Sequence, residues 1–457
     1  MVVEADMAEW IYAQVEALGA VDQDMGRLEK AVDAVTREVR RRVLERLTQA
    51  AATREEFGCP TCGEMLSVVR HRQGRTVESG FGPVRFERSY GFCPHCGHYC
   101  FPADVALGLH ERAQSSPRVQ EVCALMTLQA PAGQASEDVQ RLTGLTISAS
   151  TLHREACRQG ERALKLRQKQ EQLTATADGV AVLAGRAPRL PQHSTLVIEI
   201  DAWNIRERDH WGQTEARRKA GEESERWHWV YTATVFRLDQ RATKQSGRPV
   251  ITDRGYVATR QGLESLKRQL YAEALQRGLL QAETVLVLGD GAVWIWNLAA
   301  DTFEHATQRL DLFHAKEHLW TLAGDLYGRG SPEAEAWVRP YLRWLEQRKD
   351  GALDVIRSIE DLQRTLNAFD EKQQKALARE LAYLTEHKDR MDYKQARKQG
   401  QPSGSGAIES TCSQYQRRFK LTGQFWSLAG DEALLALDTL HRNGRWHLLF
   451  PHSADRS

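Results

Sequence analysis

Three acidic residues in the C-terminal half of the chain occupy positions where carboxylates do chemistry. Asp201 and Asp290 each end a short apolar run, residues 195–200 and 284–289, and Glu409 follows a glycine-serine turn and opens a helical pattern. Short apolar runs bounded by polar residues are typical of buried strands, so both aspartates are expected at the rim of a sheet. Gathered carboxylates are unfavourable unless cations neutralise them. The pattern therefore predicts two divalent cations that stabilise the attacking and leaving oxygens of a phosphodiester displacement.

The type of cation follows from the ligands. Mg2+ prefers oxygen ligands and keeps several waters for a reaction, so we expect two Mg2+ or Mn2+ ions at this site. Glu199 is an alternative to Asp201, because it lies two positions earlier on the same strand face. Spacing alone does not decide between these two carboxylates. No nucleophile motif is needed, since water or a hydroxyl group attacks directly.

A second metal site is predicted in the N-terminal part. The sequence Cys59-Pro60-Thr61-Cys62-Gly63 recurs as Cys93-Pro94-His95-Cys96-Gly97. Each Cys-x-x-Cys turn places two thiolates on one ion, so the four cysteines predict one structural Zn2+ in a zinc ribbon. The nearby His95, His98 and Cys100 are expected to be bystanders. Residues 76–90 alternate around Gly82-Pro83, which predicts a hairpin whose arginines touch phosphates or serve only the fold.

A helix-turn-helix pattern follows the ribbon. Residues 136–142 predict a short helix capped by Ser136, residues 143–146 a turn, and residues 148–158 a second helix. Base reading in a major groove and ordinary helical packing are equal alternatives here. The second helix carries the polar candidates for DNA contact, namely Ser150, Thr151, His153, Arg154 and Arg158.

Bulk properties set the frame for these sites. The 457 residues are 41% apolar and 27% charged with a net charge of +1, so contact with DNA must rest on local basic clusters such as the arginines of residues 34–47. No basic-then-apolar leader or long apolar run is present, which predicts a cytoplasmic, nucleoid-associated protein without a membrane span. Five of the eight cysteines lie between Cys59 and Cys100, which favours a metal over disulfides.

Several blocks of the C-terminal half resemble bacterial insertion-sequence transposases of the ISKra and ISLre type. The blocks are Gly289-Asp290-Gly291-Ala292-Val293-Trp294-Ile295-Trp296, Leu310-Asp311-Leu312-Phe313-His314-Ala315-Lys316-Glu317-His318-Leu319-Trp320, Gly404-Ser405-Gly406-Ala407-Ile408-Glu409-Ser410, Arg418-Phe419-Lys420-Leu421-Thr422-Gly423-Gln424-Phe425-Trp426-Ser427 and Asn443-Gly444-Arg445-Trp446. The resemblance runs from about Phe57 to Phe450. One residue departs from it, because Ala202 follows the first aspartate where the family commonly has glycine.

The resemblance implies a DDE enzyme with the triad Asp201, Asp290 and Glu409. One Mg2+ would be held by Asp201 and Asp290 and the other by Asp201 and Glu409, for strand cleavage and then strand transfer. Asp311 and His314 would form an Asp-x-x-His element that orders the site or contacts DNA. Asp311 as a plain helix N-cap is the alternative.

The expected fold is a multidomain α+β protein with a ribonuclease-H-like α/β catalytic domain that a helical insertion interrupts. The expected parts are N-terminal helices at 1–56, the zinc ribbon at 57–102, a helical DNA-binding domain with helix-turn-helix and linker at 103–190, the first catalytic part at 191–314, the insertion at 315–400 and the second catalytic part at 401–450.

Further DNA contacts are expected around the triad. Arg417, Arg418 and Lys420 follow Glu409 by two to three helical turns, so some of them should face the same DNA. Most tryptophans of this region are expected in the core. One or two could stack on an unpaired base, with Trp203 first because it neighbours Asp201.

The expected partners are transposon terminal inverted repeats and target DNA. The resemblance also implies a homodimer or higher oligomer in the synaptic complex. Two alternatives remain. One is a ribonuclease-H-fold nuclease or resolvase that cuts without joining, and the other is a domesticated DNA-binding protein.

Overall fold

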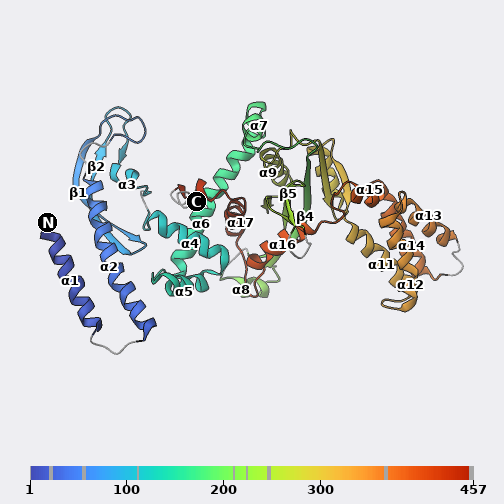
Figure 1. Cartoon of the computed structure of the whole chain (residues 1–457), viewed down its shortest axis with the longest axis horizontal. Coiled ribbons are helices and arrows are strands. Elements are labelled where there is room, and N and C mark those ends of the chain that lie inside the picture. The colour runs from blue at the N-terminus through green and yellow to red at the C-terminus, as the bar shows by residue number, and fades with distance from the viewer. Residues whose placement is uncertain are drawn as a thin grey trace. The chain divides into compact units, whose positions relative to one another are not determined.

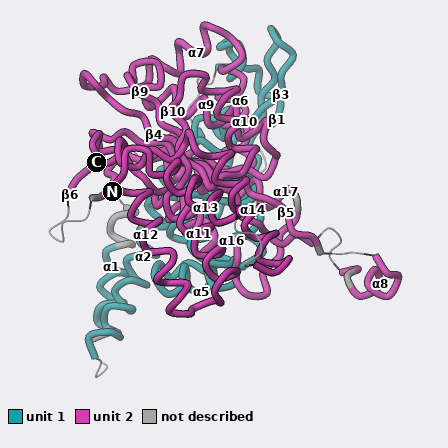
Figure 2. The backbone as a smooth tube through the Cα atoms, turned by 90° about the vertical axis from the view of Figure 1, so that its right-hand side faces the viewer, with its two compact units in different colours: residues 1–159, 454–457 teal, residues 160–453 magenta. Residues whose placement is uncertain are grey.

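The computed structural model describes residues 2–19, 24–53, 58–110, 113–208, 212–222, 225–243, 249–364 and 369–451. It is a multidomain α+β protein with a mixed sheet and a group of four neighbouring cysteines. The chain divides into two compact units, residues 1–159 and residues 160–453 (Figure 2). The division falls inside helix α6 (Ala149–Leu173) and therefore inside the domain that the sequence predicted at 103–190.

Unit 1 combines two long helices, a β-hairpin and a group of shorter helices (Figure 1). In chain order its elements are α1 (Val2–Gly19), α2 (Met25–Ala52), β1 (Ser67–Ser79), β2 (Gly82–Phe92), β3 (Tyr99–Cys100), α3 (Pro102–Ala106), α4 (Pro117–Gln129), α5 (Ala132–Thr143) and the start of α6. The Gln49 side chain joins α2 to the hairpin, because it accepts from the Glu87 amide at 2.8 Å and donates to the Glu87 carbonyl at 3.0 Å. Part of the basic face of α2 is neutralised within the helix, since Arg41 and Arg42 pair with Glu38.

The hairpin differs from the sequence prediction at its turn. Ser79 pairs with Gly82, so the chain reverses at Gly80 and Phe81, and Gly82-Pro83 already belongs to β2. The Ser79 hydroxyl closes this turn by accepting from the Phe81 amide and donating to the Gly82 carbonyl. The Gly-Pro prediction was wrong because this side-chain closure holds the turn one step earlier.

Unit 2 is built on a five-stranded mixed sheet in the order β10-β9-β4-β5-β8. In chain order, the elements of this part are α7 (Ala177–Ala184), β4 (Thr195–Arg208), α8 (Thr214–Lys219), β5 (Glu225–Arg237), β6 (Arg241–Thr243), β7 (Pro249–Ile251), β8 (Arg254–Thr259), α9 (Leu263–Gln276), β9 (Thr284–Gly289), α10 (Val293–Thr302) and β10 (Thr307–Leu310). β6 and β7 pair only with each other, as a separate two-stranded sheet. β5 runs antiparallel to both of its neighbours, β4 and β8, whereas β4, β9 and β10 are parallel. β4, the first of these strands in the sequence, is therefore the central strand of the sheet.

Helices cover both faces of this sheet. Ile198 and Ile200 of β4 belong to the large core shared with α9 and α10, whereas Val197 packs on the other face with Leu288 and Ala407. β4 reads as a nearly continuous apolar run up to Ile200 because both of its faces are buried there. Asn443, directly after the last long helix (residues 428–442), protects the outer edge, since its side-chain amide pairs with both backbone groups of Tyr256 on β8, at 2.8 and 2.9 Å.

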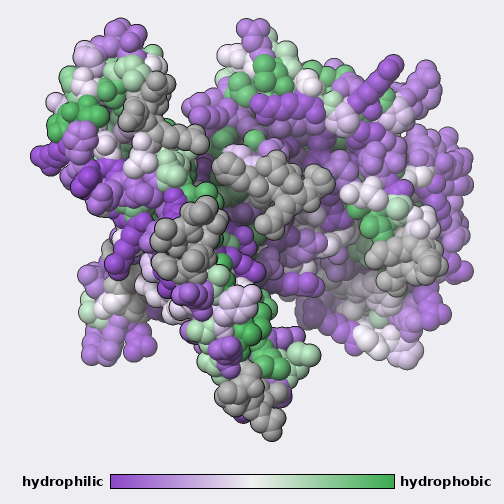
Figure 3. Space-filling view, turned by 60° about the vertical axis from the view of Figure 1, so that its left-hand side comes forward, coloured by the Kyte–Doolittle hydropathy of each residue, from purple (hydrophilic) through white to green (hydrophobic). Residues whose placement is uncertain are grey.

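The remaining helices of unit 2 follow β10. They are α11 (Leu312–Tyr327), α12 (Pro332–Gln347), α13 (Gly351–Arg364), α14 (Glu371–His387), α15 (Tyr393–Lys398), α16 (Gly406–Phe419) and α17 (Leu428–Arg442). α11 to α14 pack on one another beside the sheet (Figure 1). The surface is mainly hydrophilic on the face drawn in Figure 3. Within the described residues, no helix combines the length and hydropathy that a membrane span requires.

A buried polar network ties β4 to the start of α17. Glu207 is 1% exposed and Asp431 0% exposed, and the Arg260 guanidinium lies between their carboxyl groups. Burial and the neighbouring Glu207 carboxyl, which shares a proton with Asp431, together raise the pKa of Asp431 to about 9. Two buried carboxyls beside one guanidinium keep a proton, because two negative charges would exceed the single positive charge.

This network predicts a pH-dependent stability. Unfolding releases the Asp431 proton between about pH 4, the ordinary pKa of an aspartate, and about pH 9. The folded state binds more protons in this window, so the free energy of unfolding should fall as the pH rises through it. Asp431→Asn keeps a neutral donor toward Glu207 and should flatten this dependence. Thermal unfolding between about pH 5 and pH 8 measures it. The control is Asp361→Asn, which replaces an exposed aspartate. An equal pH dependence of stability in the wild type and both variants would contradict the assignment of this effect to Asp431.

Candidate functional site

The parallel strands β4 and β9 bring the predicted aspartates near each other. Glu199 and Leu288 form the last pair of these two strands, Asp201 follows two residues later in β4, and Asp290 directly follows the end of β9 at Gly289. The two side chains are near enough for the charge of Asp290 to act on Asp201. The next strand adds a third acid, since Gly289 pairs with Leu310 and the Asp311 amide donates to the Gly289 carbonyl at 2.9 Å.

Glu409 reaches this site on helix α16, which packs against β4 and β5. The helix is held at its first turn by Glu199, whose carboxylate accepts from the Ile408 amide at 2.8 Å. Glu199 is 1% exposed, and burial raises its pKa to about 8 even though the amides of α16 oppose the shift. This observation distinguishes the two rival carboxylates of β4. Glu199 anchors the helix, whereas Asp201 is only partly buried.

The charges of the three candidate residues influence one another. Burial raises the pKa of Asp201, and the negative charge of Asp290 raises it further. Burial also raises the pKa of Glu409, followed by the charges of Asp311 and Asp201. Mutual repulsion of this kind is relieved when a cation sits between carboxylates, and all-oxygen donors fit Mg2+ or Mn2+. The donor set therefore suits the predicted ions.

The three carboxylates are less tightly gathered than the zinc candidates. Among the described residues, only the four cysteines form a group whose ligand atoms all lie within 4.8 Å of one another. The carboxylate of Asp201 is also engaged locally, since its Oδ1 accepts from the Ala202 amide at 2.7 Å. Asp290 is held in the same way by the Ala292 amide at 3.0 Å.

Asp311 is the N-cap of α11. The sequence left this structural role as the alternative to ordering the active site or contacting DNA. Its Oδ1 accepts from the Phe313 amide at 2.9 Å, and its Oδ2 accepts from the Ser405 hydroxyl at 2.6 Å. Because the Ser405 carbonyl accepts from the Glu409 amide at 3.1 Å, Asp311 positions the start of α16. His314, one turn along α11, is half-buried and lies near enough to Asp201 to lower its pKa slightly against the effect of burial.

Two further side chains at the site were missed by sequence reasoning. The Cys412 thiol is buried and donates to Asp201 Oδ2 at 3.5 Å. Its position one helical turn after Glu409 was the available signal. The Tyr383 hydroxyl of α14 donates to the Asp290 carbonyl at 3.1 Å, and its ring stacks on His318 at 3.6 Å. Nothing in the sequence connected α14 with Asp290.

Several expected DNA contacts are overturned by burial. Trp203 is 4% exposed and donates to the Thr232 hydroxyl at 3.0 Å, so it packs in the core and does not present its ring for stacking. Arg418 is 6% exposed, and burial lowers its pKa to about 10. Its guanidinium lies over Trp426 at 5.1 Å. Arg417 and Lys420 are exposed as expected.

The four cysteines of unit 1 meet as predicted. Cys59 and Cys96 lie 3.5 Å apart and Cys62 and Cys93 3.4 Å apart, measured between sulfurs. The two turns repeat one another, because the glycine after each second cysteine, Gly63 or Gly97, has a positive φ and donates to the carbonyl of the first cysteine. Four thiolates at these distances suit a structural Zn2+.

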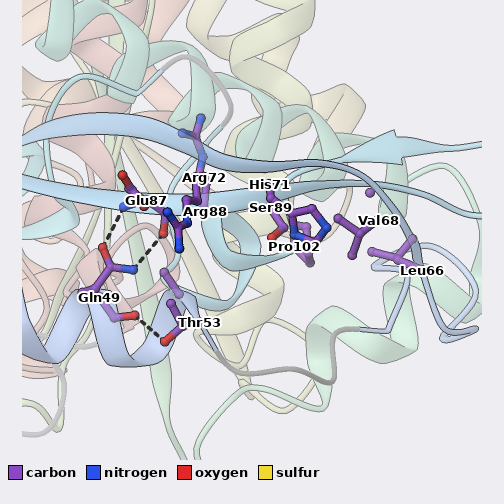
Figure 4. Close-up of a pocket in the computed structure, with 12 residues that line it drawn as sticks. Gln49, Thr53, Leu66, Val68, His71, Arg72, Glu87, Arg88, Ser89 and Pro102 are labelled. Atoms are coloured by element: carbon purple, nitrogen blue, oxygen red, sulfur yellow. Dashed lines mark hydrogen bonds between the residues drawn. The ribbon is translucent and has the colours of Figure 1, made fainter.

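Two arginines of the hairpin are engaged inside the fold. Arg75 and Arg88 both pair with Asp104 and are 7% and 9% exposed. Of the two alternatives left by the sequence, these two arginines therefore serve the fold, because the buried Asp104 carboxylate pairs with both cations. A hollow of about 700 Å3 lies between α2 and the hairpin, with Gln49 and Thr53 on one side and His71 and Ser89 on the other (Figure 4).

The helix-turn-helix candidate differs from its prediction at both helices. α5 already begins at Ala132, so Ser136 lies inside it and donates to the Ile147 carbonyl instead of capping. α5 ends at Thr143, the first residue of the predicted turn, with Gly144 as its C-cap, and α6 continues far past Arg158. α4, α5 and α6 share a core that includes Cys123, Val139 and Leu152. Ser150, His153 and Arg154 are exposed on α6, Thr151 is half-buried, and Arg158 pairs with Glu155 at 2.8 Å.

Neither the comparison with protein families nor the comparison with curated proteins found a relative of this chain. No protein-family model matches the chain, and no curated protein matches its sequence significantly.

Zinc content tests the cysteine site. We expect about one zinc per chain in the purified protein, and loss of that zinc in Cys59→Ser, because three thiolates bind structural zinc far more weakly than four. Atomic absorption measures the metal, and proteolysis of unit 1 reports the loss of its fold. Cys157→Ser, a cysteine in α6, is the matched control. Full zinc occupancy in Cys59→Ser would remove this residue from the ligands.

Proposed function

We propose that the chain is a Mg2+-dependent DNA transposase that binds transposon ends, cleaves them and joins them to target DNA. One observation carries the proposal, namely that Asp201 of β4 lies near enough to feel the charge of Asp290, which directly follows the neighbouring strand β9, while the helix that holds Glu409 packs on β4. Acids on neighbouring strand ends and on one helix provide oxygen ligands for the two metals of a phosphodiester displacement. The proposed catalytic residues are Asp201, Asp290 and Glu409.

The sheet supports a ribonuclease-H-like catalytic domain. Its first three strands, β4, β5 and β8, form an antiparallel set, and β9 and β10 then add in parallel on the other side of β4. The helical stretch from α11 to α15 separates the strand before Asp311 from the helix with Glu409. We assign this stretch to the insertion, and the Tyr383 hydrogen bond to the Asp290 carbonyl gives it a supporting role at the site.

The residues have distinct roles in this proposal. Asp201 and Asp290 would hold one Mg2+, and Asp201 and Glu409 the other. When bound, the two ions activate the attacking oxygen and stabilise the leaving oxygen. Glu199 and Ser405 orient α16, and Asp311 holds Ser405. Cys412 restrains one carboxylate oxygen of Asp201.

Nucleic-acid binding is assigned to separate surfaces. The exposed Ser150 and Arg154 of α6 are candidates for end recognition in unit 1, with Thr151 and Arg158 beside them, and Arg417 and Lys420 for DNA near the triad in unit 2. Phosphate contacts of this kind give salt-sensitive binding. Joining two ends requires two active sites, so we propose at least a homodimer in the synaptic complex. Nucleoid association follows from the same DNA binding.

Replacing a triad member tests the catalytic assignment. Asp290→Asn keeps the size of the side chain and its hydrogen bond to the Ala292 amide but removes the charge. We expect cleavage of labelled transposon ends with Mg2+ to fall at least about a hundredfold, because metal-borne charge stabilisation is worth several kcal/mol. End binding and thermal stability should persist. Asp301→Asn, an exposed aspartate that pairs with Lys267, is the control. Full cleavage by Asp290→Asn would exclude this residue from the triad.

A strand-transfer assay separates the transposase from a ribonuclease-H-fold nuclease or resolvase. Pre-cleaved ends with a free 3′-hydroxyl should yield joined product with supercoiled target DNA and Mg2+ in the wild type, and none in Asp290→Asn. Cleavage without joined product would favour the nuclease. Binding without either reaction would favour a DNA-binding protein that has lost catalysis.

A further inference from the structure

β4 and β5 continue beyond the rest of the sheet. β9 stops pairing with β4 at Glu199, and β8 stops pairing with β5 at Tyr231, but β4 and β5 remain paired as far as Arg208 and Glu225. This extension is a ribbon that begins beside Asp201. Residue Trp426 adds to its β4 edge, since the Trp426 amide donates to the Arg206 carbonyl at 3.1 Å.

The two faces of the ribbon differ sharply in burial. On one face Trp203, Ile205 and Glu207 are 4%, 0% and 1% exposed. On the other face the alternate residues of β4 are partly or fully exposed, and Trp227 and Trp229 of β5 are 59% and 56% exposed. Two neighbouring tryptophans exposed to this extent leave a large apolar area in water, which is unfavourable unless something covers it.

Arginines alternate with the aromatic rings on this open face. The Arg206 guanidinium lies 5.3 Å from the centroid of the Trp227 ring and 4.9 Å from that of Phe425. Arg208 lies 3.7 Å from the same Phe425 ring. Trp229 stands opposite Asn204, and the next residue in the row is Tyr231, which packs edge-on against Trp294. We call this row from Phe425 to Trp229 the aromatic face.

We infer that the aromatic face binds unpaired bases of single-stranded DNA. Flat rings in series stack on bases of any sequence, and guanidinium groups between them meet the phosphates that accompany each base. The positive charges of Arg206 and Arg208 complement a polyanion and argue against an apolar protein partner. A base pair hides its faces within the duplex, so the row selects unpaired strands over duplex.

The position of the aromatic face defines how a strand could reach it. Asp201 projects from the same face of the ribbon as Trp203 and Glu207, whereas Trp229, which pairs with Asn204, projects from the other face. A strand that is melted or cut at the carboxylates would therefore pass around the edge of the ribbon to reach the aromatic rings. The inference rests on the proposed function for the identity of the nucleic acid, and it names the unpaired strand as a part of the substrate.

Binding without catalysis tests the inference. The probes are a labelled oligothymidine of about 20 nucleotides and a blunt duplex of equal length, with full-length Asp290→Asn protein and no added magnesium. Removing both rings in Trp227→Ala/Trp229→Ala should weaken oligothymidine binding at least tenfold, since each stacked base is worth about 1–3 kcal/mol. Duplex binding should change less than threefold. Fluorescence anisotropy measures both affinities.

Matched variants separate stacking from general damage. Trp227→Phe/Trp229→Phe keeps aromatic rings and should retain oligothymidine affinity within threefold. Trp320→Ala removes a tryptophan that is 43% exposed on α11 and should have no effect. Unchanged oligothymidine binding in the double alanine variant, or an equal loss for both probes, would overturn the inference. A dimer that dissociates in the double alanine variant would also overturn it, because a second copy would then cover the face.

The outcome is independent of the catalytic proposal. Loss of single-strand binding in the tryptophan variants supports the aromatic face even if Asp290→Asn cleaves normally. Conversely, a metal-dependent transposase with unaltered single-strand binding in those variants keeps its proposed function and loses this site.

Discussion

The hydrogen bond between the Glu199 carboxylate and the Ile408 amide is the contact on which the candidate catalytic site depends. It joins β4 to the first turn of α16 across 209 residues of sequence. Together with the Asp311–Ser405 and Cys412–Asp201 hydrogen bonds, this anchor fixes the helix that carries Glu409 relative to Asp201. Burial of Glu199 is unfavourable for a charged carboxylate, and the amides at the start of a helix offset that cost. The site therefore includes a carboxyl group that supports the others without facing solvent.

Acidic groups at this site divide into two kinds according to their partners. Glu199 and Asp311 are buried and satisfied by backbone amides and the Ser405 hydroxyl, so their role is to position α16 and α11. Asp201, Asp290 and Glu409 are more exposed and influence one another mainly through charge. This division explains how five acidic residues can lie near one sheet edge. Two of them stabilise the fold, and three remain for the proposed cations.

The ribbon formed by β4 and β5 connects this site with the aromatic face. One strand, β4, supplies the helix anchor, the first aspartate of the proposed triad and the arginines between the exposed rings. The alternation of side chains along a strand puts a covered face and an open face on the same few residues. Catalysis and strand holding, as we propose them, would therefore share one rigid element.

The sequence by itself determined the features that depend on local spacing. The paired Cys-x-x-Cys turns predicted the four-cysteine group, because two residues between ligands fix two thiolates on one ion. The apolar runs before Asp201 and Asp290 indicated buried strands that the structure contains. Only the tertiary structure decided which residues are buried by distant segments. It placed Trp203 and Arg418 in the core, Cys412 against Asp201, and Asp104 between Arg75 and Arg88. These contacts join residues from separate elements, and local periodicity carries no information about such pairs.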